Sequence, residues 1–113
     1  MTDCLFCKIG RKEIPAKQVY EDAEILAFED IGPQAQTHIL LCPRKHLVSL
    51  TEATAEDANL LGRLQMMAAQ LATERKLTEG YRTVFNNGRG AGQSVSHLHL
   101  HLLGGRDFRW PPG

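Results

Sequence analysis

The chain has 113 residues with 13 basic and 13 acidic side chains, so its formal net charge is +0. This length predicts a single domain, 1–113, and the lack of net charge argues against bulk electrostatic binding to nucleic acid or to a membrane. No apolar run reaches the length of a membrane span, and the N-terminus lacks the features of a signal peptide, so we expect a cytoplasmic protein.

The N-terminal segment 4–15 predicts a turn or a short helix that ends at a proline. It contains two of the three cysteines, Cys4 and Cys7. An odd number of cysteines in a reducing compartment argues against a disulfide framework. The pair is therefore interpreted as half of a metal site or as a redox pair. Cys42, inside an apolar run, is expected to be a buried thiol.

The next elements predict a sheet. Segments 19–21 and 25–30 predict a hairpin, and the Gly-Pro pair within 31–35 marks a loop. The nearly continuous apolar run 38–43 is typical of a central strand buried on both faces.

One clear helix follows, with Thr54 as its N-cap and acidic residues in its first turn. Apolar side chains then recur at helical spacing up to Leu71 and form one stripe. A strand at 81–86, a glycine-rich loop at 87–94 and a strand at 97–103 complete the chain. Two hairpins around one helix predict an α+β fold with a mostly antiparallel, five-stranded sheet.

Three of the five histidines, His97, His99 and His101, alternate with leucine at the start of the last predicted strand. Successive side chains of a strand point to opposite faces, so the imidazoles should share one face and the leucines should anchor the other. An imidazole can act near neutral pH as acid, base, nucleophile or metal ligand. A solvated polar face and a zinc site are the competing interpretations.

The glycine-rich loop leads directly into these histidines. Glycines allow backbone N–H groups to approach a ligand closely, and Gln93 and Ser94 add side-chain donors. Next to an imidazole nucleophile, such a loop predicts a phosphate cradle for phosphoryl or nucleotidyl transfer through a covalent intermediate. A plain connection between two strands is the alternative.

Residues 97–103 resemble the signature of the histidine triad (HIT) family. Segments 11–17, 28–31, 33–35, 92–95 and 110–113 resemble its Hint branch, the histidine triad nucleotide-binding proteins. His101 disfavours the galactose-1-phosphate uridylyltransferases, which have a glutamine there. The resemblance covers nearly the whole chain and implies a homodimer whose sheet extends across both protomers. The tail 108–113 would then be an anchor against the partner.

The resemblance implies a purine nucleoside phosphoramidase, which hydrolyses the P–N bond of adenosine or guanosine phosphoramidates. His99 would attack the α-phosphorus, and water would hydrolyse the nucleotidyl-histidine to release a nucleoside monophosphate. His101 and Ser94 would assist at the phosphate, with His38 beside them. The implied nucleotide-binding residues are Phe28, Asp30, Ile31, Asn86, Gly92, Gln93, Ser94, His99 and His101.

Several alternatives remain open. The protein could be a dinucleoside polyphosphate hydrolase, a nucleotide-binding regulatory protein with little catalysis, or a zinc-dependent regulatory module in which all the alternating histidines bind metal. Asp30 could initiate a turn instead of binding ribose, and Phe28 and Ile31 could belong only to the core. His38 could be a buried histidine without a functional role.

The Cys-x-x-Cys pair distinguishes the chain from many Hint-branch proteins, and some bacterial-type relatives with such a pair carry zinc. We hypothesise a structural Zn²⁺ held by Cys4, Cys7, His46 and His97. A redox pair of the thioredoxin kind lacks the βαβ context that it would need.

Overall fold

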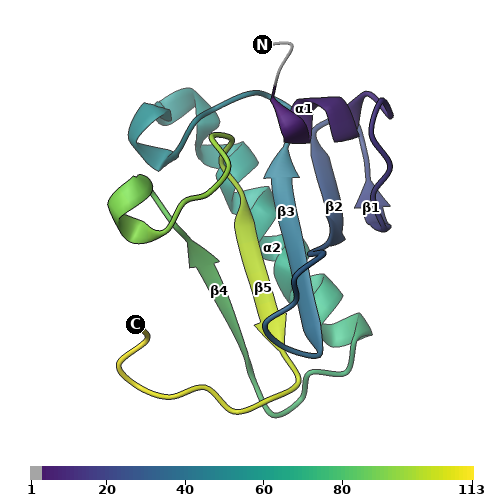
Figure 1. Ribbon diagram of the computed structural model, residues 1–113, viewed down its shortest axis with the longest axis vertical. Coiled ribbons are helices and arrows are strands. Elements are labelled where there is room, and N and C mark those ends of the chain that lie inside the picture. Colours follow the sequence, from purple (N-terminus) through teal and green to yellow (C-terminus); the bar gives the residue numbers. More distant parts are fainter. Residues whose placement is uncertain (1–3) are drawn as a thin grey trace.

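A computed structural model describes residues 4–113 and contains a five-stranded antiparallel sheet with the long helix α2 (Ala58–Glu74) against one face (Figure 1). The strand order is β1-β2-β3-β5-β4, which confirms the predicted fold class. The strands are β1 (Gln18–Glu21), β2 (Ile25–Glu29), β3 (Thr37–Pro43), β4 (Tyr81–Phe85) and β5 (Leu100–Gly104). The shorter elements are α1 (Leu5–Gly10), η1 (Leu50–Glu52), η2 (Ala55–Asp57) and η3 (Arg89–Ala91).

The period-two alternation of the strands divides the sheet into two faces. On the α2 face, a buried core includes Ile39 and Leu41 of β3 with Leu100 and Leu102 of β5. Leu64, Ala68, Leu71 and Ala72 of α2 complete this core, as the predicted apolar stripe requires. Burial of each leucine or isoleucine side chain contributes about 1.5–3 kcal/mol, so this face supplies much of the stability.

The opposite face has a smaller apolar cluster. Leu26, Phe28, Leu40 and Cys42 pack there against Phe6 and Ile9 of α1. Cys42 is buried, as expected for an inert thiol, and burial raises its pKa to about 12. Leu40 of β3 is the register partner of His101 of β5, so the histidines emerge on this second face.

The start of the main helix differs from the prediction. The Thr54 side chain accepts a hydrogen bond from the Glu56 N–H, and the Asp57 carboxylate accepts one from the Thr54 N–H. This capping box closes η2, a tight turn that continues into α2 at Ala58. Thr54 therefore caps the turn before α2 and not α2 itself.

The last strand also begins later than expected, at Leu100 instead of His97. The Leu98 N–H donates to the Leu47 carbonyl at 2.6 Å, outside the ladder with β3. The His97 side chain turns to the Pro43 carbonyl. These bonds hold 97–99 in an irregular bend, although Leu98 still packs in the α2-side core.

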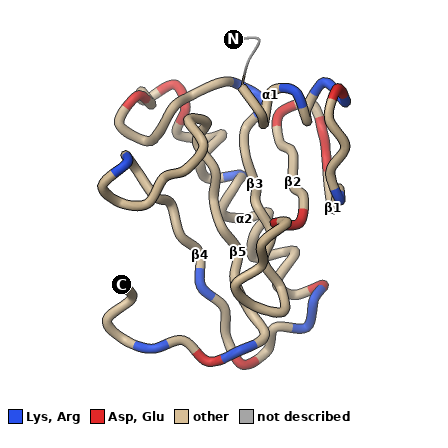
Figure 2. Tube along the Cα trace, viewed as in Figure 1, with Lys and Arg blue, Asp and Glu red and all other residues tan. Residues whose placement is uncertain are grey.

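The arrangement brings the end of β3 and the segment before β5 beside α1 (Figure 1). Figure 2 shows that β3 and β5, the two inner strands at this place, carry no lysine, arginine, aspartate or glutamate. Apart from Thr37 and the buried thiol of Cys42, the polar side chains of these two strands are His38 and His101. Across residues 4–113, no helix combines the length and apolar character needed to span a bilayer.

Candidate functional site

A pocket of about 360 Å³ opens on the sheet face opposite α2. Histidine, carboxylate, hydroxyl and apolar side chains meet in it. Its lining consists of Leu5, Phe6, Ile9, Ile14, Pro15, Ala16, Phe28, Glu29, Asp30, Ile31, Leu40, Ser94, Val95, His99 and His101. A larger hollow of about 720 Å³ lies where α2 ends and β4 begins, but its described lining residues include no histidine or cysteine. The smaller pocket is therefore the candidate active site.

His99 is held in one protonation pattern. Its Nδ1 lies 2.7 Å from the His97 carbonyl oxygen, and the side chain is buried. Because a carbonyl only accepts hydrogen bonds, Nδ1 carries a proton, and in the neutral tautomer the lone pair is therefore on Nε2. An imidazole fixed in this way presents a nucleophilic nitrogen.

A series of hydrogen bonds gives His101 the opposite tautomer to that of His99. The Gln34 N–H donates to His38 Nδ1 at 3.0 Å, so the proton of neutral His38 is on Nε2. His38 Nε2 lies 2.9 Å from His101 Nδ1 and donates to it. The proton of His101 is then on its Nε2, so this ring offers a donor where His99 offers an acceptor. The two rings lie 4.9 Å apart between centroids.

The surroundings favour the neutral forms of the His38 and His101 rings. Burial, together with the neighbouring His99 and His38, lowers the pKa of His101 to about 4, although Asp30 acts in the opposite direction. Burial also lowers the pKa of His38, and again Asp30 opposes the shift. Asp30 Oδ2 lies 3.4 Å from His38 Nε2.

Asp30 also organises the loop after β2. Its Oδ1 accepts a hydrogen bond from the Gly32 N–H at 2.8 Å, which is the turn-initiating geometry considered as an alternative role. The same carboxylate lines the pocket, so the two roles are compatible. Ile31, next in sequence, is fully exposed at the pocket rim.

The glycine-rich loop reaches the pocket through Ser94. Gln93 Oε1 accepts from the Gly88 N–H at 2.8 Å, and Gln93 Nε2 donates to the Val48 and Val95 carbonyls. The Gln93 amide therefore shapes the loop. Gly92 adopts a left-handed conformation, with φ of 91°, that favours glycine. Asn86, Gly92 and Gln93 lie in the segment leading to Ser94 but do not line the pocket.

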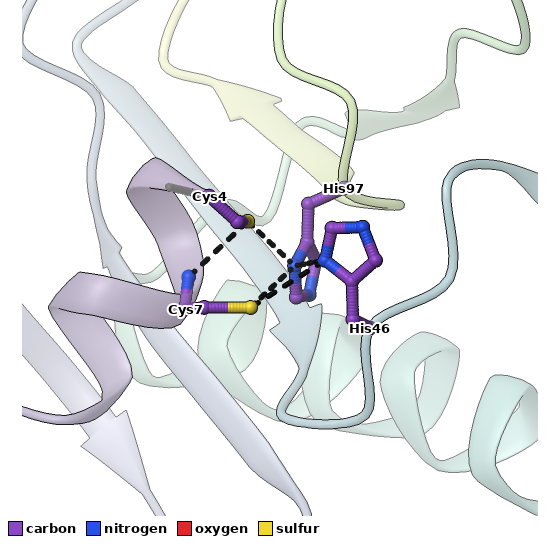
Figure 3. A group of neighbouring side chains, drawn as sticks. All are labelled: Cys4, Cys7, His46 and His97. Atoms are coloured by element: carbon purple, nitrogen blue, oxygen red, sulfur yellow. Dashed lines mark hydrogen bonds between the residues drawn. The ribbon is translucent and has the colours of Figure 1, made fainter. Parts of the chain in front are cut away.

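A second cluster lies where α1 meets the loop after β3 and the segment before β5 (Figure 3). It consists of Cys4, Cys7, His46 and His97. His97 Nδ1 is 3.2 Å from Cys4 Sγ, 3.6 Å from Cys7 Sγ and 3.1 Å from His46 Nδ1. His46 Nδ1 is 3.4 Å from Cys7 Sγ.

The geometry of this cluster fits a metal ion. A tetrahedral Zn²⁺ bound to two sulfurs and two nitrogens separates its ligand atoms by about 3.3–3.8 Å, close to the spacings found. His97 Nε2 lies 2.7 Å from the Pro43 carbonyl, so this nitrogen carries the proton and Nδ1 turns its lone pair into the cluster. Two thiols and two imidazoles converging in this way form a donor set that could hold a metal.

The three alternating histidines do not form one metal site. His97 belongs to the cysteine cluster, and His101 lies with Asp30 and His38 in a separate group. Within the described residues His99 belongs to neither group. Hydrogen bonds account for the second group, because the 2.9 Å contact between His38 and His101 satisfies a donor and an acceptor.

Of the residues expected to bind nucleotide, the pocket brings together Phe28, Asp30, Ile31, Ser94, His99 and His101. His38 lies behind His101. The sequence interpretation missed the wall formed by α1 and the following segment, namely Leu5, Phe6, Ile9, Ile14, Pro15 and Ala16. The apolar residues at positions 5, 6 and 9 share the face of a short helix, and this spacing was the available signal.

The model of the HIT domain family matches residues 11–108. An uncharacterized HIT-like protein of Synechococcus elongatus is 55% identical over 98% of this chain and 97% of its own length. A HIT family hydrolase from Legionella pneumophila has a crystal structure with a TM-score of 0.96 and 53% identity, covering 98% of this chain and all of that one. A histidine triad nucleotide-binding protein from Candida albicans has a TM-score of 0.82 and 33% identity, covering 98% and 85%.

Proposed function

This chain belongs to the HIT domain family, and on that premise we propose that it is a Hint-branch purine nucleoside phosphoramidase. The observation that carries the proposal is the pairing of a lone pair on His99 Nε2 with an N–H on the neighbouring His101 ring, in one pocket. A nucleophile beside a proton donor is what displacement of an amine from phosphorus needs.

The proposed reaction has two steps. His99 Nε2 attacks the α-phosphorus, the P–N bond breaks, and the amine leaves with its electron pair and a proton. The His101 N–H and the Ser94 hydroxyl line the pocket and can relay this proton from solvent water, each giving up one proton and taking up another. Water then cleaves the N–P bond of the nucleotidyl-histidine, which releases the nucleoside monophosphate and returns His99 to its starting form. The water that attacks in the second step returns a proton to the solvent.

The rest of the pocket matches the parts of a nucleotide. Phe6, Phe28 and Ile31 provide apolar surface for a purine base. Asp30 and Ser94 also line the pocket. In this proposal the Asp30 carboxylate would accept hydrogen bonds from the ribose hydroxyls, and the loop ending at Ser94 would contact the phosphate. The similarity to a histidine triad nucleotide-binding protein from Candida albicans supports this assignment.

The test is hydrolysis of an adenosine phosphoramidate followed by phosphorus NMR, with mass spectrometry to trap the nucleotidyl adduct on His99. Wild type should release adenosine monophosphate, and His99→Ala should lose at least about a thousandfold in kcat. An unchanged melting temperature of the variant controls for folding. Equal turnover by both proteins would falsify the mechanism.

Substrate profiling separates this proposal from its alternatives. A dinucleoside polyphosphate hydrolase would cleave diadenosine polyphosphates far better than the phosphoramidate. A regulatory protein would bind adenosine monophosphate without turnover.

We also propose that the cysteine cluster binds a structural Zn²⁺ through Cys4, Cys7, His46 and His97. When bound, the ion supplies a crosslink among α1, the loop after β3 and the segment before β5, and it takes no part in the reaction. Elemental analysis should give one zinc per chain for wild type and much less for Cys4→Ser. Wild type without stoichiometric zinc, or a variant that keeps it, would disprove this assignment.

A homodimer with a continuous sheet is the third part of the proposal. β4 is an edge strand with regular register along all five residues, whereas β1 at the other edge contains a bulge. Bulges discourage strand addition, so β4 is the edge suited to pair with a second copy. Trp110, in the tail expected to anchor the partner, is 84% exposed. Light scattering should give twice the mass of one chain.

A further inference from the structure

Helix α1 contributes to both sites. Cys4 caps the helix by accepting a hydrogen bond from the Cys7 N–H at 3.4 Å, and both sulfurs belong to the cysteine cluster. From the same helix Leu5, Phe6 and Ile9 line the pocket. A helix of six residues makes too few internal hydrogen bonds to be stable alone. Its position therefore depends on its anchors.

The two ends of α1 are anchored differently. At the C-terminal end, Arg44 Nη1 donates to the Gly10 carbonyl at 3.0 Å, and Ile9 is buried. At the N-terminal end, the described polar contacts that join the cysteine side chains to other elements are those with His46 and His97. Loss of the cluster would leave the buried Phe6 ring as the main contact of this end, whereas the other end would keep both its hydrogen bond and Ile9.

Phe6 joins the cluster to the expected nucleophile. Its ring, only 5% exposed, packs edge-to-face against the His99 imidazole with centroids 5.0 Å apart, and against the Phe28 ring at 5.2 Å. It also meets the His97 ring at 5.9 Å. A second link runs along the backbone, since the His97 carbonyl accepts the Nδ1 proton of His99.

We propose that metal occupancy of the cysteine cluster controls nucleotide affinity by fixing α1, with Phe6 as the positioning residue that transmits the effect to the pocket. A bound ion ties the N-terminal end of α1 to His46 and His97. Phe6 then completes the pocket wall and restrains the His99 ring. This inference rests on the proposed nucleotide-binding function, and it adds that the metal centre is coupled to that function instead of merely stabilising the fold.

A first experiment tests the anchoring without any nucleotide. The full chain, loaded with Zn²⁺ or stripped with a chelator, is digested briefly with trypsin and the fragments are identified by mass. Cleavage after Lys8 in α1 should be about tenfold faster in the stripped protein. Cleavage after Arg89, which lies in η3 outside the cluster, should keep its rate. Equal rates after Lys8 would overturn the anchoring.

A second experiment measures the coupling as a thermodynamic cycle. Calorimetry gives the Kd for adenosine monophosphate in wild type and in Phe6→Leu, each with and without Zn²⁺. Metal removal should raise the Kd of wild type about tenfold. In Phe6→Leu the Kd should change less than about twofold, because the transmitting ring is absent. Phe85→Leu, the same change in β4 against the α2-side core and away from the pocket and the cluster, should behave as wild type.

The outcomes separate this inference from the proposed function. If wild type binds the nucleotide equally well with and without metal, or binds no Zn²⁺, the coupling is wrong and the nucleotide site stands. If Phe6→Leu keeps the full effect of metal, Phe6 is not the transmitting residue. If metal-loaded wild type does not bind the nucleotide, both are overturned. The wild-type comparison needs no variant, so poor folding of Phe6→Leu cannot leave the coupling undecided.

Discussion

Two histidine clusters lie side by side in this protein and use the same side chain in opposite ways. At the cysteine cluster, His97 Nε2 donates a hydrogen bond to a backbone carbonyl, and the lone pair on Nδ1 points toward the three other possible metal ligands. Beside the pocket, His38 Nε2 donates a hydrogen bond to His101 Nδ1, so the lone pair of that nitrogen is already satisfied. Converging lone pairs need a cation, whereas a closed chain of donors and acceptors needs none. The hydrogen-bond partner of each ring therefore determines which nitrogen carries the proton, and whether a lone pair is left for a cation.

The largest predicted effects come from removing His99 and His97 separately, since each belongs to a different site. His99→Ala should abolish turnover by about a thousandfold or more and keep the zinc content, because His99 lies outside the cluster. His97→Ala should lose the zinc and on the order of 3 kcal/mol of unfolding free energy, because it removes a buried ligand. Elemental analysis, urea denaturation and turnover on both variants test this. Loss of zinc in His99→Ala would show that the clusters are not separate.

A smaller effect should follow from breaking the donor chain behind His101. His38→Leu leaves His101 Nδ1 and the Gln34 N–H without their partner. We expect kcat to fall about ten- to a hundredfold, as for other residues that orient a functional imidazole. His38→Gln keeps an amide donor and should recover much of the loss. If the leucine and glutamine variants fall equally, the hydrogen bond is not what matters.

The smallest predicted effect is on the pH dependence of stability. The pKa of His101 is about 4 in the folded protein and about 6.5 when unfolded. As the pH falls, the unfolded chain therefore binds a proton before the folded protein does. The free energy of unfolding is highest above pH 6.5 as far as His101 is concerned, and it decreases toward pH 4. Unfolding free energy should decrease by on the order of 1–3 kcal/mol over this window.

The matching control is His101→Gln, which cannot take up the proton. Urea denaturation of both proteins, without metal so that the cysteine cluster contributes equally, should give a flatter pH dependence for the variant. Parallel curves for the two proteins would exclude His101 as the source.

Period-two alternation was enough to predict much of the fold. It predicted the leucine face of 98–102, while the nearly continuous apolar run 38–43 predicted the buried strand β3 and the apolar stripe predicted α2. It could not predict that the last strand begins only at Leu100. That boundary depends on hydrogen bonds from residues 97 and 98 to Pro43 and Leu47, which are about fifty residues away in sequence. Contacts of this separation leave no local pattern.

The site was predictable to a similar extent. Of the residues named from the histidine triad resemblance, six meet in one pocket, whereas Asn86, Gly92 and Gln93 are not among its lining residues. The contribution of α1 was missed, since its cysteines suggested only a metal anchor. Nor does any local pattern reveal that the Gln93 amide is engaged within its own loop, with partners on Gly88, Val48 and Val95.

The alternation of leucine and histidine in β5 has an evolutionary consequence. Leu100 and Leu102 touch the helix side, while His101 faces the pocket, so a change in one set leaves the packing of the other intact. Substitutions that change substrate specificity can accumulate on the pocket side without lowering the stability that the core on the other side provides. His97 is the exception, because its imidazole serves the cysteine cluster while its carbonyl holds His99. We therefore expect position 97 to change only together with the cysteines.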